Sequence, residues 1–123
     1  MQISIHYKLY ALLLGVLWLG SCKTVQLQGT ADQYFTVSLY SKGTGIEQEA
    51  KNVVTNTIEK YTKKGYDISY TSVSWGREGE VDFCFQLQKL EPKVYHAFLD
   101  ELTRLLKDKQ VYINEKVPCR ESN

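Results

Sequence analysis

Hydrophobic and polar residues alternate strictly over residues 33–41. Phe35, Val37 and Leu39 occupy every second position, with tyrosines and hydroxyl residues between them. A period of two with aromatic and β-branched residues is typical of a strand that buries one face. The segment therefore predicts a β-strand, which Lys42-Gly43 ends.

Apolar residues then recur at helical spacing from Ile46 to Tyr61. Before them, Thr44 and Glu47 match a capping box, in which a hydroxyl and a carboxylate each accept a hydrogen bond from a backbone N–H at the helix start. Lys63-Lys64-Gly65 is a typical helix end, because positive charge suits the last turn and glycine readily adopts the left-handed conformation. We expect a helix between these boundaries.

Two more alternating runs, residues 66–75 and 80–88, flank Gly76-Arg77-Glu78-Gly79. Two such runs around a turn bracketed by glycines predict a β-hairpin. The apolar residues at the end of the first run fall out of phase with those at its start. We therefore expect a β-bulge near Thr71 or Ser72.

Glu91-Pro92 opens a second helical pattern, since proline is tolerated in the first turn. Residues 111–114 then alternate as a last strand, and residues 116–123 form a polar tail. The order β-α-β-β-α-β with right-handed crossovers predicts an antiparallel sheet, strand order 4-1-3-2, with both helices on one face. This α+β arrangement, over residues 33–115, resembles the ferredoxin-like fold. The core stripe expected on the second helix is Tyr95, Phe98, Leu99, Leu102, Leu105 and Leu106.

Residues 1–21 carry Lys8, no acidic side chain, and an apolar run from Leu9 to Leu19. A short apolar run after a positively charged start is typical of a secretory signal peptide, whereas a membrane-spanning helix needs about 20 residues. A buried core helix is the alternative, which is disfavoured because the run is apolar on every side and the following residues are polar.

The end of this segment, Leu19-Gly20-Ser21-Cys22, resembles the lipobox of bacterial lipoproteins. The resemblance implies cleavage before Cys22, a thioether-linked diacylglycerol on its sulfur, and acylation of its new amine, with palmitate as the expected group. Two or more acyl chains anchor a protein stably, at about 0.8 kcal/mol per buried methylene. The implied partner is a membrane, and residues 22–32 form a lipidated tether. Residues 23–26 contain no acid, which by analogy with lipoprotein sorting favours the outer membrane, facing the periplasm.

Composition supports one globular domain, because the chain has 123 residues, 43% of them hydrophobic and 24% charged. The full chain has 15 Lys and Arg against 14 Asp and Glu, and Lys8 leaves with the signal peptide. The mature chain therefore has a formal charge of zero. Such a secreted domain lacks the phosphate-neutralising groups that nucleic-acid binding requires, so nucleic acid is excluded as a partner.

Cys84 and Cys119 remain after lipidation of Cys22, and the expected compartment is oxidising. A structural disulfide between them is the preferred interpretation, since closing a loop of this size contributes about 3–4 kcal/mol. Two free thiols, or a redox or metal role, are the alternatives. Neither cysteine belongs to a Cys-x-x-Cys pair, and His96 is the only histidine of the mature chain, so the spacing does not favour a zinc site.

If both helices cover one face of the sheet, the opposite face is open and is a candidate binding face. Exposed tyrosines among hydroxyls and amides make good contact surfaces, because they offer large area and a polar group with few rotatable bonds. An ordinary sheet surface, partly covered by the C-terminal tail, is the alternative. The candidate binding residues are Tyr34, Thr36, Tyr40, Gln86 and Tyr112, with Trp75 at the hairpin tip.

The spacing of polar residues indicates no catalytic site and no cofactor. His96 has no accompanying pattern of Ser and carboxylate, and no calcium-binding or phosphate-binding loop occurs. The sequence favours a non-catalytic binding or accessory module with a protein partner in the bacterial envelope, either a subunit of an envelope complex or an inhibitor or immunity-type protein. A small-molecule-binding or enzymatic domain and a structural protein that self-associates through its sheet are the alternatives.

Overall fold

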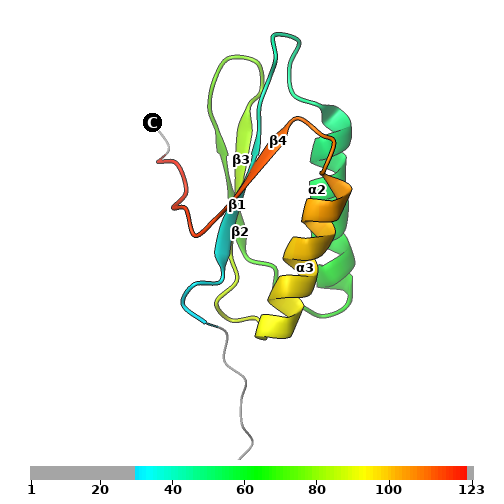
Figure 1. The fold of residues 1–123 in the computed structure, drawn as a ribbon, viewed down its shortest axis with the longest axis vertical. Coiled ribbons are helices and arrows are strands. Elements are labelled where there is room, and N and C mark those ends of the chain that lie inside the picture. Colours follow the sequence, from blue (N-terminus) through cyan, green and yellow to red (C-terminus); the bar gives the residue numbers. More distant parts are fainter. Residues whose placement is uncertain (1–29, 122–123) are drawn as a thin grey trace, which may run out of the picture.

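The computed structural model describes residues 30–121, which form a sheet with one layer of helices against it (Figure 1). The predicted signal peptide, the lipidation site Cys22 and most of the 22–32 tether lie outside the described residues. Within residues 30–121, neither helix has the length and apolar character needed to cross a membrane.

The predicted α+β architecture, with an antiparallel sheet and two helices, is confirmed. The strands lie in the order β2-β3-β1-β4, which read from the β4 edge is 4-1-3-2, and every neighbouring pair is antiparallel. The helices α2 and α3 lie on the same side of the sheet (Figure 1). The element bounds are Tyr34–Leu39 (β1), Gln48–Lys63 (α2), Tyr70–Ser74 (β2), Val81–Gln86 (β3), Pro92–Leu105 (α3) and Val111–Glu115 (β4).

The core lies between the sheet and the helices, where the alternation in β1 and β3 predicted it. Phe35 of β1 stacks on Phe85 of β3 with the ring centroids 4.7 Å apart. Phe98 of α3 meets Phe85 edge-on at 5.4 Å and Tyr61 of α2 at 5.0 Å. Aromatic pairs in this geometry add to the free energy gained by burial alone.

The helices are also joined by a polar contact at the outer side of their interface. The Tyr61 hydroxyl donates to the Glu101 carboxylate at 3.0 Å, and the Lys60 ammonium lies 2.5 Å from the same carboxylate. The hydrogen bond from Lys60 lowers the pKa of Glu101. Burial, together with Glu101, raises the pKa of Tyr61 to about 12.

The capping box predicted at Thr44 is wrong. Helix α2 begins at Gln48, and its N-cap residue Glu47 makes no side-chain capping hydrogen bond. The Glu47 carboxylate instead accepts a hydrogen bond from the Gln110 N–H at 3.0 Å and pairs with Lys109 at 3.1 Å, and both contacts lower its pKa. The Glu47 carboxylate therefore bonds to the turn between α3 and β4 instead of capping α2 as the capping-box motif predicts.

The bulge predicted near Thr71 or Ser72 is also wrong. Residues 66–69 precede the strand, and the 5 residues of β2 pair with β3 in one uninterrupted register. Val73 and Trp75 are out of phase because they lie on the open face of the sheet, opposite the helices. An edge strand with little burial on its helix side does not need a continuous apolar face.

The predicted hairpin turn between β2 and β3 is confirmed. Gly76 has a positive φ of 67°, and a Cβ there would lie 2.3 Å from the Glu80 carboxylate. That carboxylate accepts a hydrogen bond from the Glu78 N–H at 2.8 Å, inside the turn. The turn thus needs glycine for its backbone conformation, and a Cβ at this position would also displace the Glu80 carboxylate from its contact with the Glu78 N–H.

The core stripe predicted for the second helix is correct except at its C-terminal end. Leu105 is 37% exposed, whereas Leu106, the C-cap residue, is 2% exposed. Because the helix ends at Leu105, the chain direction changes there and Leu106 takes the inward position.

Candidate functional site

The antiparallel register places the candidate binding residues in rows across the open face. Tyr34 on β1 lies opposite Gln86 on β3, and Thr36 lies opposite Cys84. In the next row Ser38 lies between Asp82 on β3 and Tyr112 on β4. These residues alternate with the core residues, so they point away from the helices.

The described part of the C-terminal tail, residues 116–121, turns back from β4 over this face (Figure 1). Lys116 has a φ of 57°, and its N–H donates to the Tyr34 carbonyl at 3.0 Å. The Tyr34 hydroxyl donates to the Lys116 carbonyl at 3.1 Å. Tyr34 is half-buried and stabilises the turn that directs the tail toward β3.

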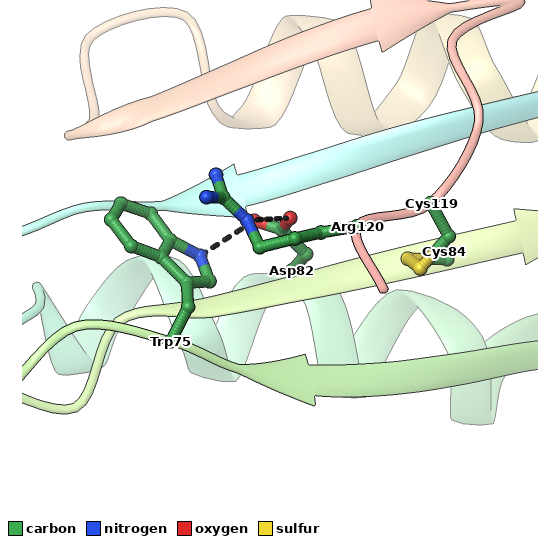
Figure 2. Close-up of a disulfide and its surroundings, with 5 residues drawn as sticks. All are labelled: Trp75, Asp82, Cys84, Cys119 and Arg120. Atoms are coloured by element: carbon green, nitrogen blue, oxygen red, sulfur yellow. Dashed lines mark hydrogen bonds and ion pairs between the residues drawn. A yellow bond between two sulfur atoms is a disulfide. The ribbon is translucent and has the colours of Figure 1, made fainter. Parts of the chain in front are cut away.

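A disulfide between Cys84 and Cys119 fixes the tail to β3 (Figure 2). The two Cα atoms are 5.6 Å apart, within the range that a disulfide requires. Cys84 is 2% exposed and its neighbour Thr36 is 5% exposed. The preferred interpretation of the two cysteines is confirmed, and Thr36 belongs to the covered part of the face.

Next to the disulfide, Arg120 contacts both Asp82 and Trp75 (Figure 2). The Asp82 carboxylate accepts a hydrogen bond from the Trp75 indole N–H at 2.8 Å and another from Arg120 Nε at 3.3 Å. The Arg120 guanidinium lies over the Trp75 ring, 4.3 Å from its centroid. Asp82 is 3% exposed, and a buried carboxylate needs such donors.

Sequence reasoning did not assign a role to Arg120. Its position next to Cys119 could have indicated a role. A disulfide from Cys119 to Cys84 of β3 brings the following side chain, Arg120, close to β3. Trp75 was a candidate for external contact. The structure leaves it half-buried, with the only hydrogen-bond donor of its side chain, the indole N–H, directed to Asp82.

A cleft of about 230 Å³ lies between the tail and the sheet. Sites for small molecules are commonly about 300–1,000 Å³, so the cleft is small for such a ligand. Of the candidate residues beside it, Gln86 keeps an exposed side chain. The cleft is lined by Tyr34, Phe35, Thr36, Cys84, Phe85, Gln86, Gln88, Val117, Pro118 and Cys119.

The remaining candidate residues, Tyr40 and Tyr112, form an aromatic pair where β1 ends and β4 begins. Their rings stack with centroids 4.6 Å apart and planes at 18°. Tyr112 is 59% exposed, the largest exposed fraction among the exposed large hydrophobic residues of the described chain. The Lys42 ammonium lies 6.0 Å from the centroid of Tyr40. The pair therefore presents a rigid aromatic surface with a cation beside it.

The histidine considered as a catalytic base lies away from this face. His96 is exposed on α3, with its ring 5.2 Å from that of Tyr95. Over residues 30–121, no three side chains among His, Cys, Asp and Glu gather in a way that could hold a metal ion. The carboxylates with lowered pKa that join separate elements, Glu47 and Glu101, tie the helices to their neighbours rather than line the open face.

Comparison with known proteins does not assign the chain to a family. No family model, no curated protein and no solved structure matches the chain. The candidate site therefore consists of a disulfide-fixed tail over part of the open face and, beside it, the Tyr40–Tyr112 pair.

Proposed function

We propose that this chain is a lipid-anchored module of the bacterial envelope that works by protein contact rather than by catalysis. The observation that carries the proposal is the stacked Tyr40–Tyr112 pair on an open sheet face, in which Tyr112 is exposed. Stacked tyrosines lose little side-chain entropy on binding and bring both apolar area and hydroxyl groups to an interface. The partner is a protein of the envelope, for which the chain acts as an accessory subunit or an inhibitor or immunity-type protein.

The proposed anchor is Cys22, and the proposed location is the outer membrane, facing the periplasm. The resemblance of Leu19-Gly20-Ser21-Cys22 to a lipobox supports the anchor. The Cys84–Cys119 disulfide supports an oxidising compartment, since such bonds persist outside the reducing cytosol.

We also propose the ferredoxin-like assignment for residues 33–115. The element order β-α-β-β-α-β and the strand order β2-β3-β1-β4 support it, as does the placement of both helices on one face. This fold leaves one sheet face without helices. The proposed contact surface is the part of that face that the tail does not cover.

Site-specific photo-crosslinking in intact envelopes tests the contact. A photoreactive residue at Tyr112 is expected to give one discrete adduct whose mass identifies a second, different protein. Adding Tyr40→Ala is expected to reduce the yield of that adduct several-fold, because the aromatic side chain at position 112 loses the ring on which it stacks.

The matched control is a photoreactive residue at His96, which is also exposed but lies on helix α3. The same adduct in similar yield from both positions would contradict a specific contact at the aromatic pair. A Tyr112 adduct containing only this chain would instead favour the self-associating alternative.

Intact mass tests the anchor. The wild-type chain is expected to begin at Cys22 and to carry the added mass of a diacylglycerol and an acyl group. Cys22→Ala is expected to retain residues 1–21 and gain no lipid mass, whereas Cys119→Ala should be lipidated like the wild type. A wild-type chain that keeps residues 1–21 would refute the proposed anchor.

A further inference from the structure

The outer edge of β2 carries backbone groups that the sheet does not use. The Gln86 N–H donates to the Ser69 carbonyl at 3.0 Å, and the Trp75 N–H donates to the Glu80 carbonyl at 2.9 Å. In an antiparallel ladder, alternate residues bond to the neighbouring strand. The residues between them, Tyr70, Ser72 and Ser74, therefore direct their N–H and C=O groups outward from the edge.

This edge lacks the features that normally prevent pairing with another chain. Proteins protect sheet edges with charged residues, prolines or bulges. Residues 68–76 contain no charged residue and no proline, and β2 has no bulge. Tyr70 is 41% exposed, and Ser72 and Ser74 are exposed as well. By contrast, the other edge strand, β4, ends with Glu115 and continues into Lys116.

Two opposite charges flank the uncharged stretch symmetrically. Asp67 precedes Ser72 by as many residues as Arg77 follows it. Both side chains are exposed, and neither forms an ion pair with another residue of the described chain. If a second copy of β2 pairs antiparallel about Ser72, the end of each strand that carries Asp67 lies beside the end of the other strand that carries Arg77.

The register about Ser72 is distinguished from its neighbours by these charges. Registers centred on Thr71 or Val73 would also bring outward backbone groups face to face. Each of them would shift Asp67 by two residues along the edge relative to Arg77 of the other copy, which separates the opposite charges. The register about Ser72 also pairs the whole strand, with Tyr70 opposite Ser74 of the other copy.

We propose that two copies of this chain dimerise by antiparallel pairing of β2 with β2, centred on Ser72. The two-fold axis is perpendicular to the sheet, so both open faces lie on the same side of one continuous sheet. Tyr70, Ser72 and Ser74 each exchange backbone hydrogen bonds with the second copy. This dimer depends neither on the lipid anchor nor on the contact proposed for Tyr112.

Oxidative crosslinking of the full chain in detergent solution tests the register. In the proposed dimer, Ser72 lies opposite itself, and the Cα atoms of such a hydrogen-bonded pair are about 5.5 Å apart, within disulfide range. Ser72→Cys is expected to form a covalent dimer on mild oxidation. Ser74→Cys is the matched control, and it should stay monomeric on a denaturing gel because it lies opposite Tyr70. Absence of a Ser72→Cys dimer, or equal crosslinking of both variants, would overturn the proposal.

A charge exchange tests the ion pairs without new cysteines. Asp67→Arg alone and Arg77→Asp alone each bring like charges to the same end of the interface, at both ends. Sedimentation is expected to show dimerisation weakened roughly tenfold for each variant. An equimolar mixture restores opposite charges at both ends and is expected to recover dimerisation. A mixture no better than either variant would contradict the pairing, whereas it would leave the Tyr112 adduct unaffected.

Discussion

Replacing Cys84 and Cys119 together with alanine is expected to lower the free energy of unfolding by about 3–4 kcal/mol. The disulfide closes a loop with a sequence separation of 35, and its loss returns that conformational freedom to the unfolded chain. For a domain of this size, the midpoint of thermal unfolding should fall by roughly 15–25 °C. Thermal unfolding followed by circular dichroism measures the shift.

The wild-type chain under a reducing agent is the matched control for this variant. It is expected to unfold at a similar temperature to the double variant, and the reducing agent should have no further effect on the variant. The end of the tail should also loosen, since Arg120 then holds it to the sheet through a half-exposed side chain that contacts Asp82 and Trp75. Equal stability of the oxidised and reduced wild type would contradict a stabilising role for the bond.

Phe98→Ala is expected to lower the free energy of unfolding by about 3–5 kcal/mol, the usual cost of truncating a fully buried aromatic residue. Phe98 is 0% exposed, and its ring lies 5.4 Å from Phe85, 5.0 Å from Tyr61 and 6.1 Å from Phe35. Alanine would leave a cavity between the helices and the sheet. Denaturant unfolding of the oxidised protein measures the loss.

Leu105→Ala on the same helix is the control for Phe98→Ala. Leu105 is 37% exposed, so its truncation removes little buried area and should cost less than about 1 kcal/mol. Equal losses from the two variants would show that the aromatic centre at Phe98 does not dominate the core.

The elements that were correctly predicted are those whose pattern repeats along the chain. The alternation in β1 and β3 and the apolar stripes of α2 and α3 report directly which side chains meet the core. The start of α2 was mispredicted because Glu47 bonds to Gln110, which is distant in sequence. A local motif cannot show that a remote backbone N–H competes for its carboxylate.

The candidate site was predictable as a face but not as an accessible surface. Thr36 and Tyr112 both alternate outward, yet Thr36 is 5% exposed and Tyr112 is 59% exposed. The difference is due to the tail, which crosses β1 and bonds to Cys84. Arg120 lies over the Trp75 ring because the same disulfide fixes the tail to β3.

The amino-acid sequence by itself determined which residues form strands and helices and which face of each is apolar, because these depend on the spacing of neighbouring side chains. It also indicated that Cys84 and Cys119 could form a disulfide, because they are the two cysteines other than Cys22. Only the tertiary structure decided that β2 is an unprotected edge, that the tail covers part of the open face, and that Tyr112 stays exposed beside Tyr40. These features depend on which distant segments lie side by side, and chain packing rather than local pattern sets that arrangement.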